Sequence, residues 1–317
     1  MVVTFIFLLA ETLNPAFMPR SLLSIDDLSK TEVMEVFNQA DELRNAEPGP
    51  DSIQPVIGSL LFFEKSTRTR LGFEAAAWRL GVKTLVMYET KVNDTMSAAE
   101  SLPDTIRTLD AFSSFYCIRH PDSDVFDEVT PYTKQPVINS GNGYDEHPTQ
   151  ALIDGYTMWH RFGEIDGLSV SFVGQLKYSR AAHSLLRLLS KFSDVSVKEF
   201  APQQLQVEGY TEGLTANGNT FSSHEQPEWG TEDIVYVTGF PPKNPDGEFP
   251  QELRDRYKVT EETVNSLRPE AVILNPLPRI DEIAQEVDDL PNAHYFMQNK
   301  LGLFVRMAVI QTFCLES

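Results

Sequence analysis

Hydrophobic positions along the first half of the chain alternate between short apolar runs and stretches with a helical period of 3.6 residues. Strands are predicted at residues 56–63, 84–88, 115–118 and 136–139. Helices are predicted at 29–43, from 66 to a glycine stop at Gly81, and at 102–112 and 147–162. This order of strand and helix is typical of a parallel sheet.

The second half of the chain repeats the same rhythm. Strands are predicted at residues 168–173, 195–200, 234–238 and 271–274, with a clear helix at 180–192 and a last amphipathic helix at 303–314. The pattern therefore predicts an α/β fold of two domains, each with a central parallel sheet flanked by helices. The boundary between them is expected near Gln150.

Composition and charge exclude several classes of partner. The 317 residues include 41% hydrophobic and 23% charged ones, the balance of a folded globular protein. Lys+Arg 26 against Asp+Glu 46 gives a net charge of −20, which repels nucleic acids and anionic lipid surfaces. An anion site must then be a local basic exception, and no nucleic acid or membrane is expected as a partner.

The two cysteines and the N-terminal residues indicate the cellular compartment in which the protein is expected. Cys117 and Cys314 lie in apolar runs, so we expect buried thiols in a reducing, cytoplasmic setting and no metal site. Residues 1–10 are apolar, but they are too few to span a bilayer and lack the basic start of a signal peptide. Residues 1–20 are interpreted as an N-terminal extension.

The segment from Phe62 to Arg70 carries the strongest chemical signal. A strand leads directly into a helix whose first turn holds Ser66, Thr67, Arg68 and Thr69. Free N–H groups at a helix N-terminus, hydroxyls and guanidinium groups all bind phosphate oxygens. Helix caps alone account for the hydroxyl residues and leave Arg68 and Arg70 unexplained.

Two further polar segments follow predicted strands. Arg119 closes the strand at 115–118, and His147 and Gln150 open the helix that follows 136–139. Ligands of parallel sheets bind beyond the carboxyl ends of the strands, where all these residues are expected to meet. A histidine before a proline is usually a cap or a packing residue, but His147 one turn from Gln150 also suits a polarised carbonyl beside an NH₂ group.

Five motifs in this order resemble the aspartate/ornithine transcarbamoylase family, and most closely its aspartate carbamoyltransferase catalytic chains. The motifs are residues 66–70 (Ser-Thr-Arg-Thr-Arg), 119–121 (Arg-His-Pro), 147–150 (His-Pro-Thr-Gln), 174–180 (Gly-Gln-Leu-Lys-Tyr-Ser-Arg) and 276–279 (Pro-Leu-Pro-Arg). The resemblance implies a carbamoyl-phosphate-binding domain at 21–150 and an acceptor domain at 151–296. It also implies a C-terminal helix at 297–317 that packs back on the first domain.

The resemblance further implies a reaction and its donor site. A carbamoyl group would pass from carbamoyl phosphate to an amine, as in pyrimidine biosynthesis, in a cytoplasmic homotrimer with no metal and no cofactor. Arg68, Thr69, Arg119 and His147 would be catalytic. The residues that would bind carbamoyl phosphate are Ser66, Thr67, Arg68, Thr69, Arg119, His147, Gln150, and the carbonyls of Pro276 and Leu277.

The acceptor half departs from the family's pattern. Arg180, which in the family contacts the acceptor's α-carboxylate, is present, as is Arg279. The family's aspartate enzymes carry Thr-Arg-x-Gln where this chain has Thr238 followed by Gly239, Phe240 and Pro241. The family's intersubunit loop should present Ser and Lys where this chain has Asp94 and Ala98, and Asn275 and Gln175 replace a His and an Asp.

Three interpretations of this departure remain open at this point. The chain is a carbamoyltransferase for an acceptor less acidic than aspartate, with Gly239, Phe240 and Pro241 at the rebuilt acceptor site. Alternatively it is a silent paralogue that binds carbamoyl phosphate or acts as a structural or regulatory subunit. In the third interpretation it is an aspartate enzyme in which Lys91 or Lys243 compensates for the missing residues.

Overall fold

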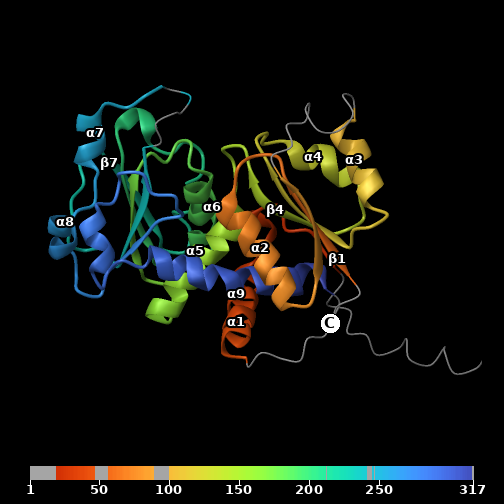
Figure 1. Ribbon diagram of the computed structural model, residues 1–317. Helices are drawn as coiled ribbons and strands as arrows, with labels where there is room; N and C mark the ends of the chain where they lie inside the picture. Colours follow the sequence, from red (N-terminus) through yellow and green to blue (C-terminus); the bar gives the residue numbers. More distant parts are fainter. Residues whose placement is uncertain are drawn as a thin grey trace, which may run out of the picture.

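The computed structural model describes residues 19–46, 56–88, 100–211, 213–240, 245 and 247–315 of the chain. It forms two lobes, each built on a parallel sheet (Figure 1). The predicted fold class is confirmed. The helices are α1 (Lys30–Asn45), α2 (Thr67–Arg79), α3 (Leu102–Leu109), α4 (Val125–Val129), α5 (Pro148–Phe162), α6 (Arg180–Leu189), α7 (Gln251–Arg256), α8 (Glu261–Ser266) and α9 (Tyr295–Cys314).

The strands divide between the two sheets. They are β1 (Ile57–Phe62), β2 (Lys83–Tyr88), β3 (Phe115–His120), β4 (Val137–Asn142), β5 (Ser169–Gly174), β6 (Ser196–Phe200), β7 (Thr220–His224), β8 (Ile234–Gly239) and β9 (Val272–Leu274). The first sheet has the order β2-β1-β3-β4 and the second the order β7-β6-β5-β8-β9, with parallel pairing throughout. The order of each sheet therefore reverses at one point: between β1 and β3 in the first, and between β5 and β8 in the second.

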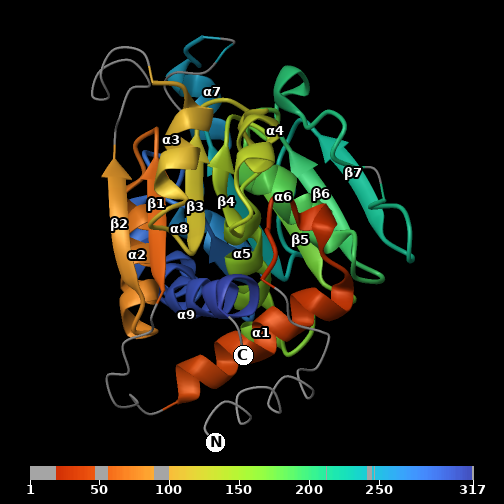
Figure 2. The same ribbon diagram turned by 90° about the vertical axis from the view of Figure 1, so that its right-hand side faces the viewer.

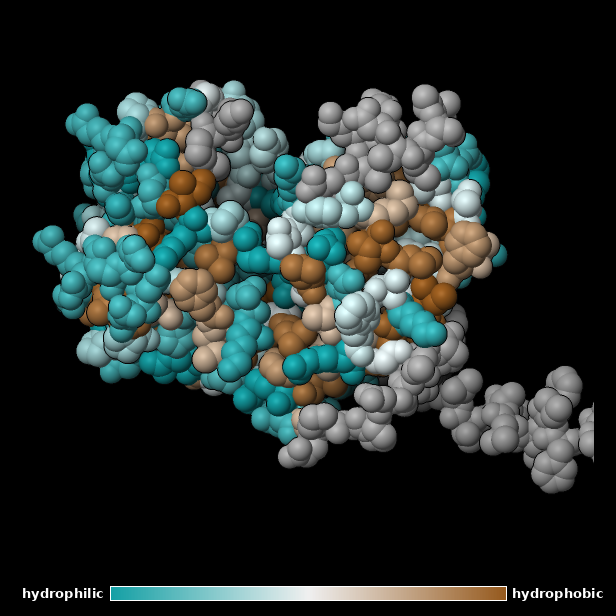
Figure 3. All heavy atoms as spheres, viewed as in Figure 1, coloured by the Kyte–Doolittle hydropathy of each residue, from teal (hydrophilic) through white to brown (hydrophobic). Residues whose placement is uncertain are grey.

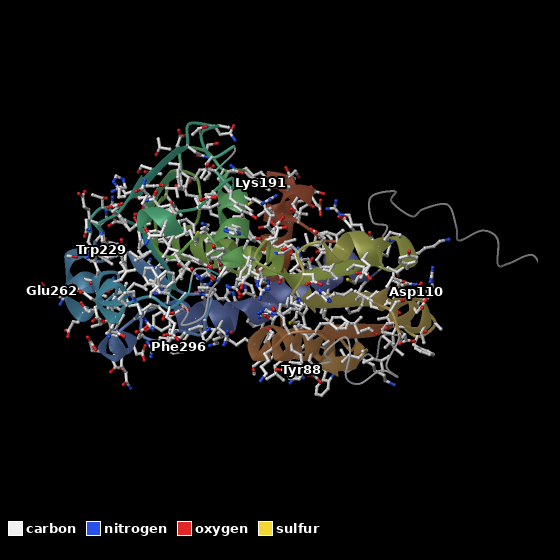
Figure 4. All side chains as sticks on the ribbon, turned by 90° about the horizontal axis from the view of Figure 1, so that it is seen from above. Tyr88, Asp110, Lys191, Trp229, Glu262 and Phe296 are labelled. Atoms are coloured by element: carbon white, nitrogen blue, oxygen red, sulfur yellow. The ribbon has the colours of Figure 1, made fainter. Side chains whose placement is uncertain are left out.

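Helices α5 and α9 join the two lobes. α9 packs against α1, α2 and α5, and it also contacts β9 of the second sheet. Figure 2 shows α9 lying across the base of the sheets with α1 beneath it. Seen from above, Asp110 of the first lobe and Trp229 and Glu262 of the second lie at opposite ends of the molecule (Figure 4). The hydrophobic cluster that includes Leu22 runs through α5 and α9 into the second sheet, and a further cluster lies within each lobe.

Local sequence signals explain several element boundaries. Ser29 caps α1 by accepting from the backbone N–H of Glu32, and the Glu32 carboxylate accepts from the Ser29 backbone N–H in return. Gly81 adopts φ 73° directly after the end of α2, as the predicted glycine stop requires. Cys117 and Cys314 are buried and unpaired, in agreement with the sequence prediction.

The predicted start of the last helix is wrong, and the helix α4 and the strand β7 were not predicted. The last helix begins at Tyr295 rather than at residue 303, because buried positions continue through its first two turns. β7 was not predicted, because its five residues are mostly exposed and polar and carry no apolar signal. Among the residues that the structure describes, no helix is long and apolar enough to cross a membrane.

Candidate active site

The reversal points of both sheets face one cavity. Ser66 follows β1 and Arg119 lies in β3, on the two sides of the first reversal point, while Arg180 follows β5 at the second. Ligands bind at such points because the loops on either side diverge and leave a crevice. The crevice here is a cavity of about 480 Å³ that has lining residues from both lobes. In the space-filling view a hollow separates the two lobes (Figure 3).

The start of α2 forms one wall of this cavity. Lys65, Ser66, Thr67, Arg68 and Thr69 all line it. Ser66 is the N-cap residue of α2, but its side chain makes no hydrogen bond to the helix backbone. Arg70, in contrast, turns away: its Nη1 lies 3.0 Å from Glu74 Oε2 and its guanidinium stacks over the Tyr88 ring. Of the two arginines in the predicted anion site, Arg68 therefore lines the cavity and Arg70 does not.

Arg119 and Arg180 share one carboxylate. Glu64 Oε1 lies 2.6 Å from Arg119 Nε and 2.5 Å from Arg180 Nη2. Arg180 also donates to the Gly143 carbonyl at 2.8 Å. Burial, together with the charge of Arg180, lowers the pKa of Arg119 to about 10, so it stays charged at neutral pH.

His147 lies among these cations. Its backbone N–H donates to Ser184 Oγ at 2.8 Å, and its ring nitrogens lie 3.5 Å from Thr69 Oγ1 and 3.3 Å from Thr149 Oγ1. Burial, and then the charge of Arg119 and Arg180, hold the pKa of His147 well below its usual 6.5. The imidazole is therefore neutral and has one ring N–H to donate.

The segment after β9 completes the wall opposite α2. The Leu277 carbonyl accepts a hydrogen bond from Arg68 Nη2, which ties α2 to this segment. Asn275 Oδ1 accepts from the Leu277 N–H at 2.6 Å. Pro276 and Leu277, whose carbonyls are predicted to bind the carbamoyl group, both line the cavity.

A carboxylate also lines the cavity, on the segment after β9. Glu282 lines the cavity and accepts from Asn275 Nδ2 at 3.2 Å and from the backbone N–H groups of Ile280 and Asp281 at 2.7 and 3.0 Å. A Cβ built on Gly239 would lie 2.7 Å from Glu282 Cδ, and Gly239 adopts φ 68°. A glycine is therefore the residue that fits beside Glu282.

The structure brings most of the sequence-predicted site residues together. The predicted residues that line the cavity are Ser66, Thr67, Arg68, Thr69, Arg119, His147, Gln150, Arg180, Phe240, Pro276 and Leu277. Gly239 lies behind the wall, against Glu282. Arg279 does not line the cavity: it pairs with Asp288 and donates to Tyr295 Oη. Pro241, Lys243, Lys91, Asp94 and Ala98 lie outside the described residues.

Several lining residues were not predicted from the sequence, and Arg306 is the most notable of them. Arg306 is buried in α9, and burial lowers its pKa to about 10. Its guanidinium occupies space left by two glycines, since a Cβ on Gly72 or on Gly302 would come within 2.9 Å of it. In the sequence, Arg306 is the one charged residue of the otherwise apolar run 303–310, and this could have indicated a buried arginine with a functional role. Gln298 and Glu282 carried no comparable signal.

Within the described residues, no cluster of His, Cys, Asp and Glu is arranged to hold a metal ion. The cavity is lined by four arginines, Arg68, Arg119, Arg180 and Arg306, by the neutral His147, by hydroxyl residues at a helix N-terminus, and by Pro276 and Leu277. Such a set binds a phosphate ester and polarises a carbonyl beside it.

Two family models match nearly the whole chain. Residues 20–160 match the aspartate/ornithine carbamoyltransferase carbamoyl-P binding domain, and residues 166–313 match the Asp/Orn binding domain of the same family. The chain belongs to the aspartate/ornithine carbamoyltransferase family. Among curated relatives, it is 36% identical to the aspartate carbamoyltransferase catalytic subunit of Methanocaldococcus jannaschii over 92% of this chain and 97% of the relative. For the Thermoplasma acidophilum catalytic subunit the identity is 37%, with the same coverage.

Solved structures agree with this assignment. Aspartate transcarbamoylase from Trypanosoma cruzi in complex with carbamoyl phosphate superposes with a TM-score of 0.88 at 28% identity, covering 94% of this chain and 97% of that one. The same enzyme with carbamoyl phosphate and aspartate gives 0.87 at 29%, covering 94% and 96%. The M. jannaschii catalytic subunit gives 0.83 at 34%, covering 93% and 98%.

Proposed function

We propose that this chain transfers the carbamoyl group of carbamoyl phosphate to the amino group of an amino acid. The observation that carries the proposal is the convergence of Arg68, Arg119 and neutral His147 on one cavity at the reversal points of both sheets. Relatives named for this activity, and a solved relative that holds carbamoyl phosphate, support it. In the same proposal, residues 21–150 form the donor domain and 151–296 the acceptor domain.

Each donor-side residue has a part in the proposed reaction. The phosphate lies at the N-terminus of α2, held by the hydroxyls of Ser66, Thr67 and Thr69 and by Arg68. Arg119 bridges the phosphate and the carbamoyl oxygen, which also accepts from the His147 ring N–H. These donors stabilise the oxygen as it gains negative charge. Gln150 and the carbonyls of Pro276 and Leu277 accept from the carbamoyl NH₂.

The chemical step needs no metal and no cofactor. A neutral amine attacks the carbamoyl carbon, a C–N bond forms, and the tetrahedral intermediate expels phosphate as the C–O bond breaks. The departing phosphate takes the proton that the amine loses. Binding both partners in one cavity supplies much of the rate enhancement, because it makes the attack effectively unimolecular.

The acceptor has two candidates, each favoured by a different observation. Aspartate is supported by the names of the relatives and by the T. cruzi complex. An amino acid with an uncharged side chain is favoured by the Glu282 carboxylate at the acceptor end and by Gly239, where the family's aspartate enzymes carry an arginine. In both cases Arg180 holds the α-carboxylate.

Phosphate release with carbamoyl phosphate and either aspartate or asparagine tests the proposal, since these acceptors differ only in side-chain charge. If Glu282 selects the acceptor, asparagine is turned over faster, and Glu282→Gln moves the ratio towards aspartate. Faster turnover of aspartate by the unmodified chain identifies aspartate as the acceptor. Binding of carbamoyl phosphate without phosphate release from any amine would indicate a silent paralogue.

We further propose a homotrimer that uses an apolar face on α2 and β2. Leu71, Trp78, Leu85 and Val86 are 46, 64, 42 and 38% exposed there, and β2 is an edge strand. Hydrophobic side chains gather over this lobe in Figure 3. Exposed apolar side chains gathered on one face are typical of subunit contacts. Sedimentation should give three copies, and Trp78→Glu should shift the protein towards monomers.

A further inference from the structure

A buried carboxylate stands directly behind the cavity wall. Asp154 lies one helical turn after Gln150 on α5, and no part of it is exposed. Its Oδ1 accepts from Gln150 Nε2 at 2.7 Å and from Gln298 Nε2 at 2.6 Å, and its Oδ2 accepts from Tyr236 Oη at 2.7 Å. The three donors come from α5, α9 and β8, so this one carboxylate joins both lobes.

A carboxylate is a costly group to bury here. Desolvation raises the pKa of Asp154 to about 7, against an ordinary 3.8. In its ionised form it can only accept hydrogen bonds. Any side-chain amide that contacts it must therefore present its NH₂ end, and the oxygen end of that amide is turned the other way.

This constraint fixes the Gln150 side chain. Gln150 lines the cavity with Arg68 and His147, whereas Asp154 lies outside the lining. Since the NH₂ end is held by Asp154, the oxygen is the end that Gln150 offers to a ligand. The Gln150 oxygen can accept a hydrogen bond from a ligand that carries an N–H group at this place. A ligand with a methyl group there leaves the oxygen without a hydrogen-bond donor and binds more weakly.

The same carboxylate fixes a second amide. Gln298 donates to Asp154 through Nε2, and its Oε1 accepts from the Asn275 backbone N–H at 3.0 Å. Asn275 begins the segment whose Leu277 carbonyl accepts from Arg68. Through Gln298, Asp154 therefore also holds in place the carbonyls that line the cavity opposite α2.

We propose that Asp154 is a positioning residue that makes the cavity select a carbamoyl group over an acyl group, by holding the Gln150 amide with its oxygen towards the ligand. The inference rests on the proposed carbamoyl phosphate site and adds the residue that sets its selectivity. Asp154 itself touches no substrate.

Carbamoyl phosphate and acetyl phosphate form the test pair, because they differ only in NH₂ against CH₃. Each is titrated, freshly dissolved at pH 8, into the unmodified chain and into Asp154→Asn. The unmodified chain should prefer carbamoyl phosphate by about tenfold or more. In Asp154→Asn the new amide can turn its own NH₂ to Gln150, so the preference should fall to about twofold or less. The affinity for acetyl phosphate should change less than about threefold.

Controls separate this role from a merely structural one. Tyr236→Phe removes one bond to Asp154 Oδ2 and keeps both amide bonds, so the preference should persist. If Asp154→Asn weakens both ligands equally and the preference survives, the inference is wrong. Asp154→Ser, which also removes the carboxylate, provides the same test if Asp154→Asn does not fold.

The outcome for the unmodified chain distinguishes the two proposals. Equal affinity for carbamoyl and acetyl phosphate would overturn the selectivity inference and leave the carbamoyl phosphate site standing. Failure to bind either compound would overturn the proposed function, and the inference with it.

Discussion

The carboxylate oxygen of Glu64 lies 2.6 Å from Arg119 Nε. It therefore forms an ion pair with the same guanidinium group that binds the phosphate and the carbamoyl oxygen in the proposed mechanism. The same oxygen contacts Arg180, so one negative charge compensates two partly buried positive ones. Without it, the guanidiniums of Arg119 and Arg180 would repel each other in a poorly solvated site.

Glu64→Gln should therefore lower the free energy of unfolding by about 1–3 kcal/mol. Inorganic phosphate would then supply the missing negative charge, so the rise in melting temperature on adding phosphate should exceed that of the unmodified chain. Thermal denaturation with and without phosphate measures both effects. A smaller phosphate-induced shift in the variant would mean that Glu64 assists anion binding.

Arg68→Ala should remove most of the stabilisation that carbamoyl phosphate gives. The side chain lines the cavity at the start of α2, and loss of one charged hydrogen bond costs about 1.5–3 kcal/mol, or roughly 10- to 100-fold in affinity. Arg79→Ala is the control, since Arg79 is exposed in the last turn of the same helix. Equal thermal shifts in both variants would exclude Arg68 from the site.

His147→Ala should lower the rate of carbamoyl transfer by about 10²–10³, the usual cost of a donor aimed at developing oxyanion charge. Because burial and neighbouring arginines keep the pKa of His147 well below 6.5, the rate should show no titration of this group between pH 6 and 8. A packing role predicts a lowered melting temperature and an unchanged rate per folded molecule, so both are measured on one preparation.

Gly239→Ala should destabilise the protein more than Gly163→Ala. Both glycines have positive φ, 68° and 84°, but an added Cβ at Gly163 meets nothing within 4 Å, whereas at Gly239 it meets Glu282. The shared backbone strain costs about 1 kcal/mol, and the close contact should add about 1–2 kcal/mol. Equal destabilisation in chemical denaturation would show that Glu282 moves aside freely, and would weaken its assignment to the acceptor end.

Glu199 should make stability depend on pH. It is buried in β6, where desolvation raises its pKa from 4.5 to about 7 although Ser223 and the Val207 N–H donate to it. A raised pKa means that the fold prefers the neutral carboxyl, so its contribution is complete below about pH 4.5 and is lost as the pH rises to about 7. Glu199→Gln should reduce the loss of stability between pH 5 and 8 by about 2–3 kcal/mol. The exposed Glu270→Gln should leave this loss unchanged.

The sequence by itself determined the succession of most elements and predicted which residues of the first lobe meet in the cavity. Apolar periodicity and caps such as Ser29 act over a few residues, so they can be read locally. Ser66, Arg119 and His147 could be placed together because the carboxyl ends of parallel strands share one edge. β7 was not predicted, because an exposed strand of five residues has no apolar pattern.

Only the tertiary structure decided which neighbouring side chains control the site. Arg70 has the same local signal as Arg68 yet turns to Glu74, and Arg279 turns to Asp288. Asp154, Glu282 and Arg306 act through contacts across α2, α5, β8, β9 and α9, and the contact between Asp154 and Gln298 alone joins residues 144 positions apart along the chain. Such contacts depend on how helices and sheets pack, and packing over that separation leaves no periodic trace in the sequence.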